Sequence, residues 1–168
     1  MIKDARNSAS RAAELSGLML LYTGRYRPSL KRTDLREFLE EHRSGFEDAL
    51  GEGLNLGLRL AGDSPAVVQG DQQMILRAVE NVLKNASEAM EDREGPVVLS
   101  LQTVTLTVED LREGYVRETP EPGRFARITV SDAGPGMSGE TLRRLFEPYY
   151  STKFTGRGLG LPAALGIV

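Results

Sequence analysis

One long amphipathic helix most constrains how this chain can fold. The sequence predicts it from Asp71 to about Asp92, because apolar side chains recur there at spacings of three and four residues. That apolar face comprises Met74, Ile75, Ala78, Val79, Val82, Leu83, Ala86, Ala89 and Met90. Such a wide face has to be buried against another layer of secondary structure. We therefore expect the domain to be assembled around this helix.

Strands are predicted on both sides of the helix. Leu54, Leu56, Leu58 and Leu60 alternate with other residues, and Val67 and Val68 form a second short strand. After a Gly95-Pro96 turn, a long strand is predicted over 97–108. Its apolar parity changes near Gln102 and Thr103, which predicts a bulge or bend. A loop over 109–124 leads to a strand through Ala126, Ile128 and Val130 that ends at Asp132.

Further helices complete the pattern. Thr33 or Asp34 is expected to cap a helix that ends at Gly51 and buries Leu35, Phe38, Leu39, His42, Phe46 and Leu50. A short helix should open at Ser138 or Gly139 and close by Pro148, and a last helix should begin near Leu159. Helices and strands do not alternate strictly, which predicts an α+β fold with two layers.

Composition excludes several function classes. The net charge of −3 argues against a nucleic-acid binder that works by bulk electrostatics. The chain has no Cys and one His, which excludes thiolate chemistry, Cys-ligated zinc and any His-cluster metal site. No apolar run approaches the roughly 20 residues that cross a bilayer.

Three groups of residues suggest chemistry. Asn81, Asn85 and Glu88 lie along one edge of the long helix with Lys84 beside them. Their oxygens suit a hard cation such as Mg²⁺, although a solvated helix face would have the same spacing.

The second group is the turn that runs from Asp132 through Gly134 and Gly136 to Met137, directly after a strand. Glycine lets the backbone turn tightly and approach a flat ligand, and the Asp could accept a hydrogen bond from an exocyclic amine. An ordinary strand–turn–helix connection is the alternative.

The third group is a glycine-rich stretch, Gly156-Arg157-Gly158-Leu159-Gly160, after a Ser-Thr-Lys segment. Backbone N–H groups in such a stretch can hold an anion, and Lys153 and Arg157 add positive charge. It follows a loop rather than a strand and has no Gly-Lys-Ser/Thr ending, so it is neither a dinucleotide fingerprint nor a P-loop. A flexible glycine hinge is the simpler alternative. Together the three groups predict a nucleotide site.

These three groups, together with the segment 145–153, resemble the four motifs of sensor histidine kinases. These kinases belong to the GHKL superfamily, which also holds type II topoisomerases, the ninety-kilodalton heat-shock chaperone and mismatch-repair proteins. Residues 80–89 resemble the asparagine box, 132–137 the first glycine box, 145–153 the phenylalanine box and 156–161 the second glycine box. The resemblance implies a Bergerat-type ATP-binding fold, a two-layer α/β sandwich with a mixed sheet and helices on one face.

By this resemblance, Asp132 binds the adenine amine, and Gly134 and Gly136 shape the adenine pocket. Asn85 and Asn81 are the expected Mg²⁺ ligands, and Asn81 and Lys153 the expected catalytic residues. Phe146 would anchor a lid between Pro148 and Gly156, and Lys153 would sense the terminal phosphate. The remaining residues assigned to ATP are Lys84, Thr152, Gly156, Arg157, Gly158, Leu159 and Gly160.

The resemblance also implies a domain organisation. Residues 1–27 resemble the second helix of the kinase dimerisation hairpin, and 28–168 the catalytic domain, which would lack its last strands. The parent would be a homodimeric phosphoprotein that passes the ATP γ-phosphoryl group to an upstream His, and then to a response-regulator receiver domain. We expect it in the cytoplasm, with a possible membrane anchor upstream, and without nucleic acid as a partner.

Two other functions stay open. A gyrase-like or chaperone-like ATP hydrolase would need a carboxylate over the γ-phosphate, and Glu80 is one residue out of register for that role. A nucleotide-binding module without transfer activity is the other. His42, in Glu41-His42-Arg43-Ser44, is interpreted as a structural residue, so this chain is expected not to phosphorylate itself.

Overall fold

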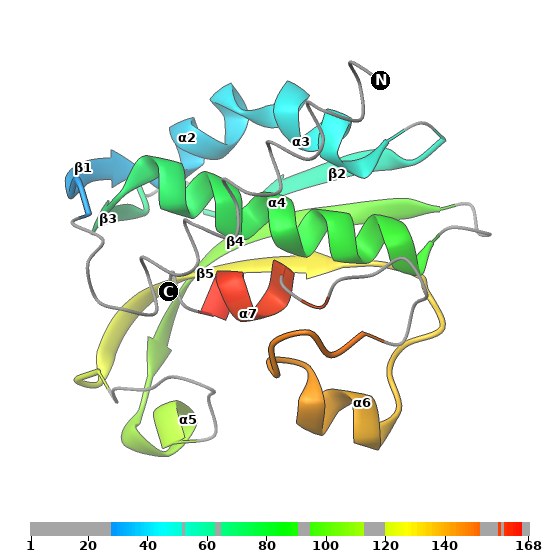
Figure 1. Cartoon of the computed structure of the whole chain (residues 1–168). Coiled ribbons are helices and arrows are strands. Elements are labelled where there is room, and N and C mark those ends of the chain that lie inside the picture. Colours follow the sequence, from blue (N-terminus) through cyan, green and yellow to red (C-terminus); the bar gives the residue numbers. More distant parts are fainter. Residues whose placement is uncertain are drawn as a thin grey trace.

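The computed structural model describes residues 28–51, 53–62, 65–90, 95–112, 120–151, 158 and 160–165. The helix predicted over 1–27, by resemblance the second one of a dimerisation hairpin, lies outside these ranges. Within them, the long helix α4 (Gln72–Ala89) crosses a sheet, with further helices beside it (Figure 1). This is the two-layer arrangement of helices and a mixed sheet that the sequence predicts.

The main sheet has the strand order β2-β4-β5. β2 (Asn55–Leu60) runs parallel to β4 (Pro96–Leu106), and β4 runs antiparallel to β5 (Gly123–Ser131), so the sheet is mixed as expected. A separate pair joins β1 (Lys31–Asp34) to β3 (Val67–Gly70). Strand β1 was not predicted, because Lys31 and Arg32 are exposed and its four residues show no apolar alternation.

The core lies between one face of this sheet and the helices. It contains Leu35, Phe38, Leu39, Phe46, Leu50, Leu56, Ala66, Val79, Leu83, Ala86, Met90, Val97, Leu99 and Leu101. In β5, Ala126, Ile128 and Val130 pack against this core, while the residues between them are exposed. The alternation predicted for this strand is therefore confirmed from Ala126 to Val130.

The predicted helix over 35–50 is interrupted at His42. Asp34 caps its start as expected, since its carboxylate accepts the amide of Arg36 at 3.0 Å. α2 (Leu35–Glu41) then ends, and α3 (Arg43–Leu50) begins after His42, which has φ −95° and ψ 9°. Both the amide and Nδ1 of His42 contact the carbonyl of Phe38, at 3.2 and 2.9 Å.

Of the bulge or bend predicted in β4, the bulge is absent. The pairing of β4 with β5 keeps one register from Val98 to Leu106. Burial does change parity, from Leu101 to Val104, but this happens where the partner strand β2 ends at Leu60. The parity change thus marks the end of a neighbouring strand, beyond which β4 and β5 continue as a two-stranded ribbon (Figure 1).

Val108 opens a short helix, α5 (Val108–Arg112), where the sequence predicted the end of a strand and a loop. Thr107 and Asp110 form a reciprocal capping box. The carboxylate of Asp110 accepts the amide of Thr107 at 2.8 Å, and the hydroxyl of Thr107 accepts the amide of Asp110 at 3.3 Å. The carboxylate of Asp110 also accepts the hydroxyl of Thr107 at 2.9 Å, and the two hydrogen bonds that this carboxylate accepts from the amide and hydroxyl of Thr107 lower the pKa of Asp110. The spacing Thr-x-x-Asp was the signal missed.

Two short helices complete the described structure. α6 (Gly139–Arg144) is capped by Ser138, as predicted, but ends before Pro148 in a series of turns. α7 (Gly160–Leu165) packs against α4 and buries Pro162, Ala163 and Ala164. Among the described helices, none is long and apolar enough to cross a membrane.

Candidate functional site

The helix α4 is held firmly at its N-terminus. The residue Asp71 is 8 % exposed, and its carboxylate accepts the amides of Gln73 and Met74 at 3.0 and 3.3 Å. It also accepts the amide of Ser29 at 2.7 Å, from the segment that precedes β1. The predicted asparagine pair therefore stands on a helix that is fixed at its first turn.

Asn81 and Asn85 lie one turn apart on α4, and both side chains are half-buried. Neither side-chain amide group hydrogen-bonds to another residue that the structure describes. Lys84 is exposed between them. The oxygen-rich edge predicted from the spacing thus exists, and the helix's apolar residues face the core beside it.

Gly134 lies against the C-terminal end of the same helix. A Cβ atom at Gly134 would be 3.0 Å from both Cβ and the carbonyl oxygen of Ala89, and 2.7 Å from Oδ1 of Asp132. Asp132 shapes the turn itself, since its Oδ1 accepts the amide of Gly134 at 2.8 Å. Only glycine fits this position without displacing its neighbours.

Gly136 is required for a different reason. A Cβ atom there would meet nothing within 4 Å, but φ is +73°, the left-handed region that glycine tolerates best. The two glycines of the first motif are therefore demanded by packing and by backbone conformation respectively.

The second glycine motif reaches the other end of this edge. A Cβ atom at Gly160 would lie 3.8 Å from Cβ and Oδ1 of Asn81, which is van der Waals contact. Gly158 has φ +59°, and its carbonyl accepts the amide of Tyr149 at 2.9 Å. Thr152, Lys153, Gly156, Arg157 and Leu159 were assigned to the site from the sequence and lie outside the described residues.

The two glycine motifs therefore contact one helix edge at its two ends, with Asn85 between them. At about 1.5 Å per residue, the contacts at Asn81 and Ala89 are about 12 Å apart along α4. Segments far apart in sequence are thus brought to one row of α4 residues: Asn81, Asn85 and Ala89.

The C-terminal part of the chain carries a family signature. Residues 70–168, more than half of the chain, match the family described as "Histidine kinase-, DNA gyrase B-, and HSP90-like ATPase". The chain belongs to this ATPase family. Together with the chain's sensor kinase relatives, this match confirms the predicted GHKL-type catalytic domain of a sensor histidine kinase.

Curated relatives of this ATPase domain include sensor kinases. The chain is 28 % identical to sensor kinase CckA of Brucella abortus, over 99 % of the chain and 17 % of that protein. It is 31 % identical to the C4-dicarboxylate transport sensor protein DctS of Rhodobacter capsulatus, over 100 % of the chain and 24 % of that protein. The chain thus spans about a quarter or less of the length of these relatives.

Solved structures share the fold. The histidine kinase AdeS of Acinetobacter baumannii superposes with a TM-score of 0.68 at 22 % identity, over 99 % of this chain and 68 % of that one. Full-length ShkA, solved in complex with AMPPNP, superposes with a TM-score of 0.73 at 19 % identity, over 98 % of this chain and 31 % of that one. These likenesses confirm the mixed sheet covered by helices.

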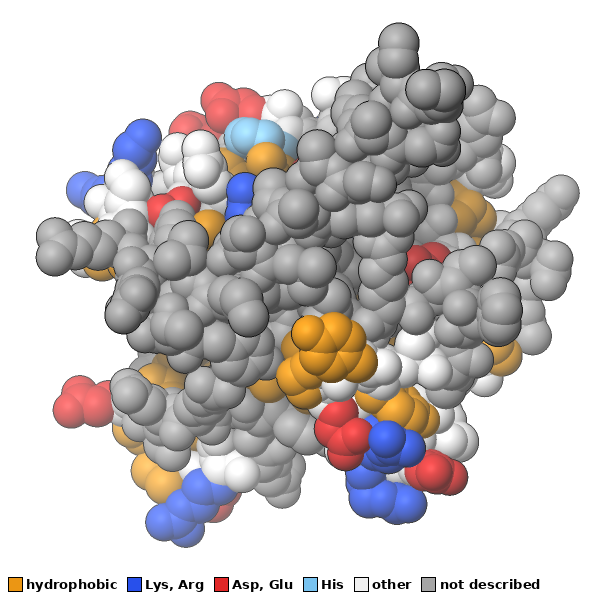
Figure 2. Space-filling view, in the orientation of Figure 1, with side chains coloured by type: hydrophobic (Ala, Val, Ile, Leu, Met, Phe, Trp, Pro, Cys, Tyr) orange, Lys and Arg blue, Asp and Glu red, His pale blue; other side chains and the backbone are white. Residues whose placement is uncertain are grey.

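Phe146, assigned to the site by resemblance, is half-buried in the turns after α6. The helix α6 itself buries no residue, and Met137, Leu142 and Tyr149 around it are exposed. Figure 2 shows hydrophobic side chains beside acidic and basic ones where α6 lies in Figure 1. In this ATPase domain, α6 and these exposed side chains therefore face solvent.

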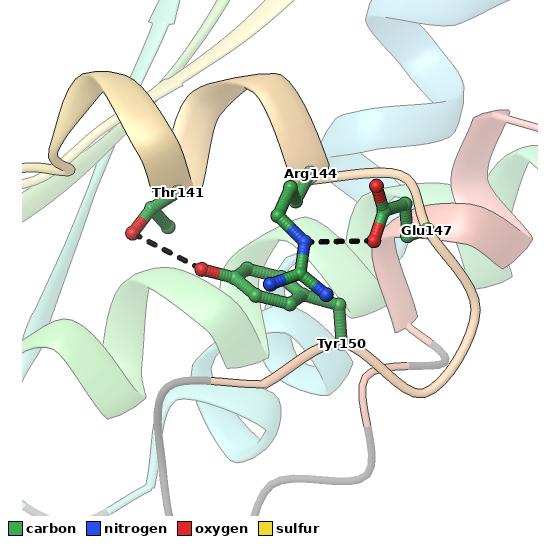
Figure 3. Close-up of polar contacts among 4 residues, drawn as sticks. All are labelled: Thr141, Arg144, Glu147 and Tyr150. Atoms are coloured by element: carbon green, nitrogen blue, oxygen red, sulfur yellow. Dashed lines mark hydrogen bonds and ion pairs between the residues drawn. The ribbon is translucent and has the colours of Figure 1, made fainter.

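Sequence reasoning missed a cluster on this segment (Figure 3). The guanidinium of Arg144 lies 4.1 Å above the centre of the Tyr150 ring, and its Nε donates to Glu147 at 2.9 Å. This hydrogen bond raises the pKa of Arg144. The spacing of Arg144 and Glu147 by three residues was a local signal for their ion pair. Tyr150 joins the cluster only because of the turns that follow α6.

A groove of 560 Å³ opens elsewhere, between α3 and β2. It is lined by Arg43, Glu47, Asp48, Gly51, Leu54, Asn55 and Leu56. None of the residues assigned to the ATP site is among them. The site assignment therefore rests on motif placement along α4 and not on this groove.

Proposed function

We propose that the chain binds ATP along the edge of α4 between Asn81 and Ala89. The observation that carries this proposal is that both glycine motifs contact that one edge, at opposite ends. A nucleotide has a flat base at one end and phosphates at the other. The first motif, with its Asp, suits the base, and the second, with its backbone N–H groups, suits the phosphates. Asp132 marks the end for the base, and Gly158 and Gly160 mark the end for the phosphates.

The adenine end of the proposal depends on how Asp132 uses its two oxygens. Oδ1 accepts the amide of Gly134, which leaves Oδ2 as an acceptor for an exocyclic amine. The carboxylate is exposed and is part of a turn fixed by packing on Ala89. Asp132 is therefore proposed to select a base that carries an amine donor.

Mg²⁺ is proposed to bind at Asn85, with Asn81 one turn away. Among the described residues there is no group of three or more His, Asp and Glu side chains that could hold a metal ion. The amide oxygens of the two Asn residues suit Mg²⁺, which takes few protein ligands and completes its shell with phosphate oxygens and water. When bound, the ion would neutralise charge on the phosphates.

The remaining phosphate contacts are proposed from the family resemblance. Thr152, Lys153, Gly156, Arg157 and Leu159 precede or adjoin α7, and Lys84 is exposed on the α4 edge. Cationic side chains and backbone N–H groups position phosphates and offset their charge, which is the main contribution of the protein in phosphoryl transfer.

In its parent, the domain is proposed to transfer the γ-phosphoryl group to a His on an upstream helix, for relay to a receiver domain. Its relatives are named as sensor kinases, and ShkA was solved with AMPPNP, an ATP analogue. We further propose a homodimeric parent whose catalytic domain works in the cytoplasm.

His42 is proposed not to serve as the phosphate acceptor. Its Nδ1 contacts the carbonyl of Phe38, and its ring centre lies 4.3 Å from that of Phe38 and 6.5 Å from that of Phe46. The ring is thus engaged in joining α2 to α3. Incubation with labelled ATP should leave no acid-labile phosphate on this chain, and phosphate mapped to His42 would overturn this point.

Titration with a non-hydrolysable ATP analogue tests the proposed site. Asp132→Asn is the informative variant, because the new side chain can still accept from Gly134 but presents an NH₂ group where the base amine would donate. We expect affinity for the analogue to fall at least tenfold. Asp48→Asn, an exposed Asp on α3, is the matched control and should bind normally. Unchanged binding by Asp132→Asn would contradict the adenine assignment.

A further inference from the structure

Tyr150 is fastened across one turn of α6. Its ring lies under the guanidinium of Arg144, 4.1 Å from the ring centre, and its hydroxyl donates to Thr141 at 3.5 Å (Figure 3). The backbone amide of Tyr150 also donates to the carbonyl of Glu147 at 3.2 Å. Three independent contacts therefore fix where the backbone runs at Tyr149 and Tyr150.

That stretch of backbone in turn holds the second glycine motif. The amide of Tyr149 donates to the carbonyl of Gly158 at 2.9 Å. Gly158 approaches so closely that a Cβ atom there would be 2.6 Å from the carbonyl carbons of Tyr149 and Tyr150. Two residues later, Gly160 lies against Asn81. The position of the glycines beside α4 thus depends on the position of Tyr149 and Tyr150.

We propose that Arg144 and Tyr150 are positioning residues, whose stacking holds Gly158 and so sets Gly160 against Asn81, which places the backbone of these two glycines for the phosphates. Neither residue touches the nucleotide in this proposal. It rests on the proposed ATP site and adds to it the two side chains that determine its phosphate end.

The contact that does this is modest in strength and specific in geometry. An exposed cation over an aromatic ring stabilises a contact enough to change an equilibrium by about two- to fivefold. Arg144 is held in place over the ring by its hydrogen bond to Glu147. Because the backbone of Tyr149 and Tyr150 contacts Gly158, loss of the Tyr150 ring should weaken phosphate binding selectively.

The test compares two ligands on the whole chain. The non-hydrolysable ATP analogue reports on both ends of the site, whereas adenosine reports on the base end alone, and both affinities can be followed by NMR chemical-shift titration. Tyr150→Leu and Arg144→Gln should each weaken the analogue about two- to fivefold and leave adenosine unchanged. Tyr150→Phe loses only the hydroxyl contact with Thr141, so the ring stack should preserve most of the affinity.

Matched variants separate positioning from general damage. Arg143→Gln removes the neighbouring exposed Arg of α6 and should change neither affinity. Arg144→Lys keeps a cation over the ring and should restore part of the loss. Arg144 is exposed, so Arg144→Gln should fold even if Tyr150→Leu does not.

The outcomes distinguish this inference from the proposed function. If the unaltered chain binds neither ligand, the proposed ATP site is wrong. If it binds both, but Arg144→Gln and Tyr150→Leu weaken them equally or leave both unchanged, the positioning role is wrong and the ATP site stands. A lower melting temperature with an unchanged ratio of the two affinities would also overturn the positioning role.

Discussion

Gly134 lies directly against Ala89, the last residue of α4, with room for no further atom between them. A Cβ atom at Gly134 would be 3.0 Å from both Cβ and the carbonyl oxygen of Ala89. The turn after β5 is thereby seated on the same helix that carries Asn81 and Asn85. This contact fixes the distance between the proposed adenine end of the site and the rest of it.

Substituting the two glycines of this turn should therefore have different effects. Gly134→Ala should destabilise the protein by about 1–3 kcal/mol, because an added methyl group overpacks a backbone contact. Gly136→Ala should cost about 1 kcal/mol through its left-handed conformation alone.

Replacement by Asn distinguishes the two causes, since Asn tolerates the left-handed region better than Ala but is larger. Gly136→Asn should recover most of the stability, and Gly134→Asn should be worse than Gly134→Ala. Urea unfolding measures all four variants. Equal losses at the two positions would contradict the distinction.

Of Gly158 and Gly160, the two described glycines of the second motif, Gly158 should tolerate substitution less. Its φ of +59° is strained for other residues, and an added Cβ atom would meet the backbone of Tyr149 and Tyr150. Gly158→Ala should destabilise by about 2–4 kcal/mol and weaken the ATP analogue. Gly45→Ala is the matched control.

Gly45 lies within α3, and a Cβ atom there would meet nothing within 4 Å. Gly45→Ala should stabilise the protein by about 0.4–1 kcal/mol, because Ala restricts the unfolded chain at a compatible position. A stable Gly158→Ala protein with normal affinity would show that the Tyr149–Gly158 contact is dispensable.

Regular periodicity accounts for most of what the sequence could predict of the fold. The helix α4 and the strands β2 and β5 follow from spacings of 3.6 and 2 residues, which are local properties. Strand β1 could not be found this way, because Lys31 and Arg32 become a strand only by pairing with Gly70 and Gln69. The break at His42 likewise has no Gly or Pro at the break itself, so no local signal in the sequence marks it.

For the site, the sequence could identify which residues are unusual but not where they meet. Gly134 and Gly160 were recognisable as members of two glycine motifs. That they pack on Ala89 and Asn81 of a single helix depends on the path of the whole chain between them. The Arg144–Tyr150 stack was missed for the same reason, since it forms only once the turns after α6 are in place.

The proposed magnesium ligand can be tested through the ion's effect on binding. Asn85→Ala removes the amide oxygen proposed to face the ion, so the increase in affinity for the ATP analogue on adding Mg²⁺ should largely disappear. Affinity in the presence of a chelator should change little. Gln73→Ala, an exposed amide in the first turn of α4, should keep the full increase. Calorimetry of Asn85→Ala with and without Mg²⁺ measures this increase in affinity. An increase as large as that of the unaltered chain would contradict the assignment.

Glu80 distinguishes the kinase from a hydrolase. It precedes Asn81 by one residue, so its side chain leaves α4 about 100° around the helix axis from that of Asn81. A carboxylate in that direction is not expected to activate water at the proposed phosphate end. Phosphate release by the unaltered chain should therefore be slow and should persist in Glu80→Gln. Steady turnover that Glu80→Gln abolishes would favour the hydrolase.

Asp71 should stabilise the domain through two separable sets of contacts. Oδ1 caps α4 through Gln73 and Met74, and Oδ2 accepts the amide of Ser29. Asp71→Ala should cost about 1–2 kcal/mol, as expected for the loss of an N-cap. Asp71→Asn can keep the cap but presents an NH₂ group to Ser29, so it should lose about 1 kcal/mol or less.

Urea unfolding of these Asp71 variants, with Asp48→Asn as control, measures both contributions. The carboxylate of Asp71 joins the segment before β1 to the helix that carries Asn81 and Asn85. Asp71→Asn should therefore also show faster amide exchange at Ser29, while the first turn of α4 stays protected. Loss of protection along the whole of α4 in Asp71→Asn would show instead that the contact with Ser29 is needed for the cap itself.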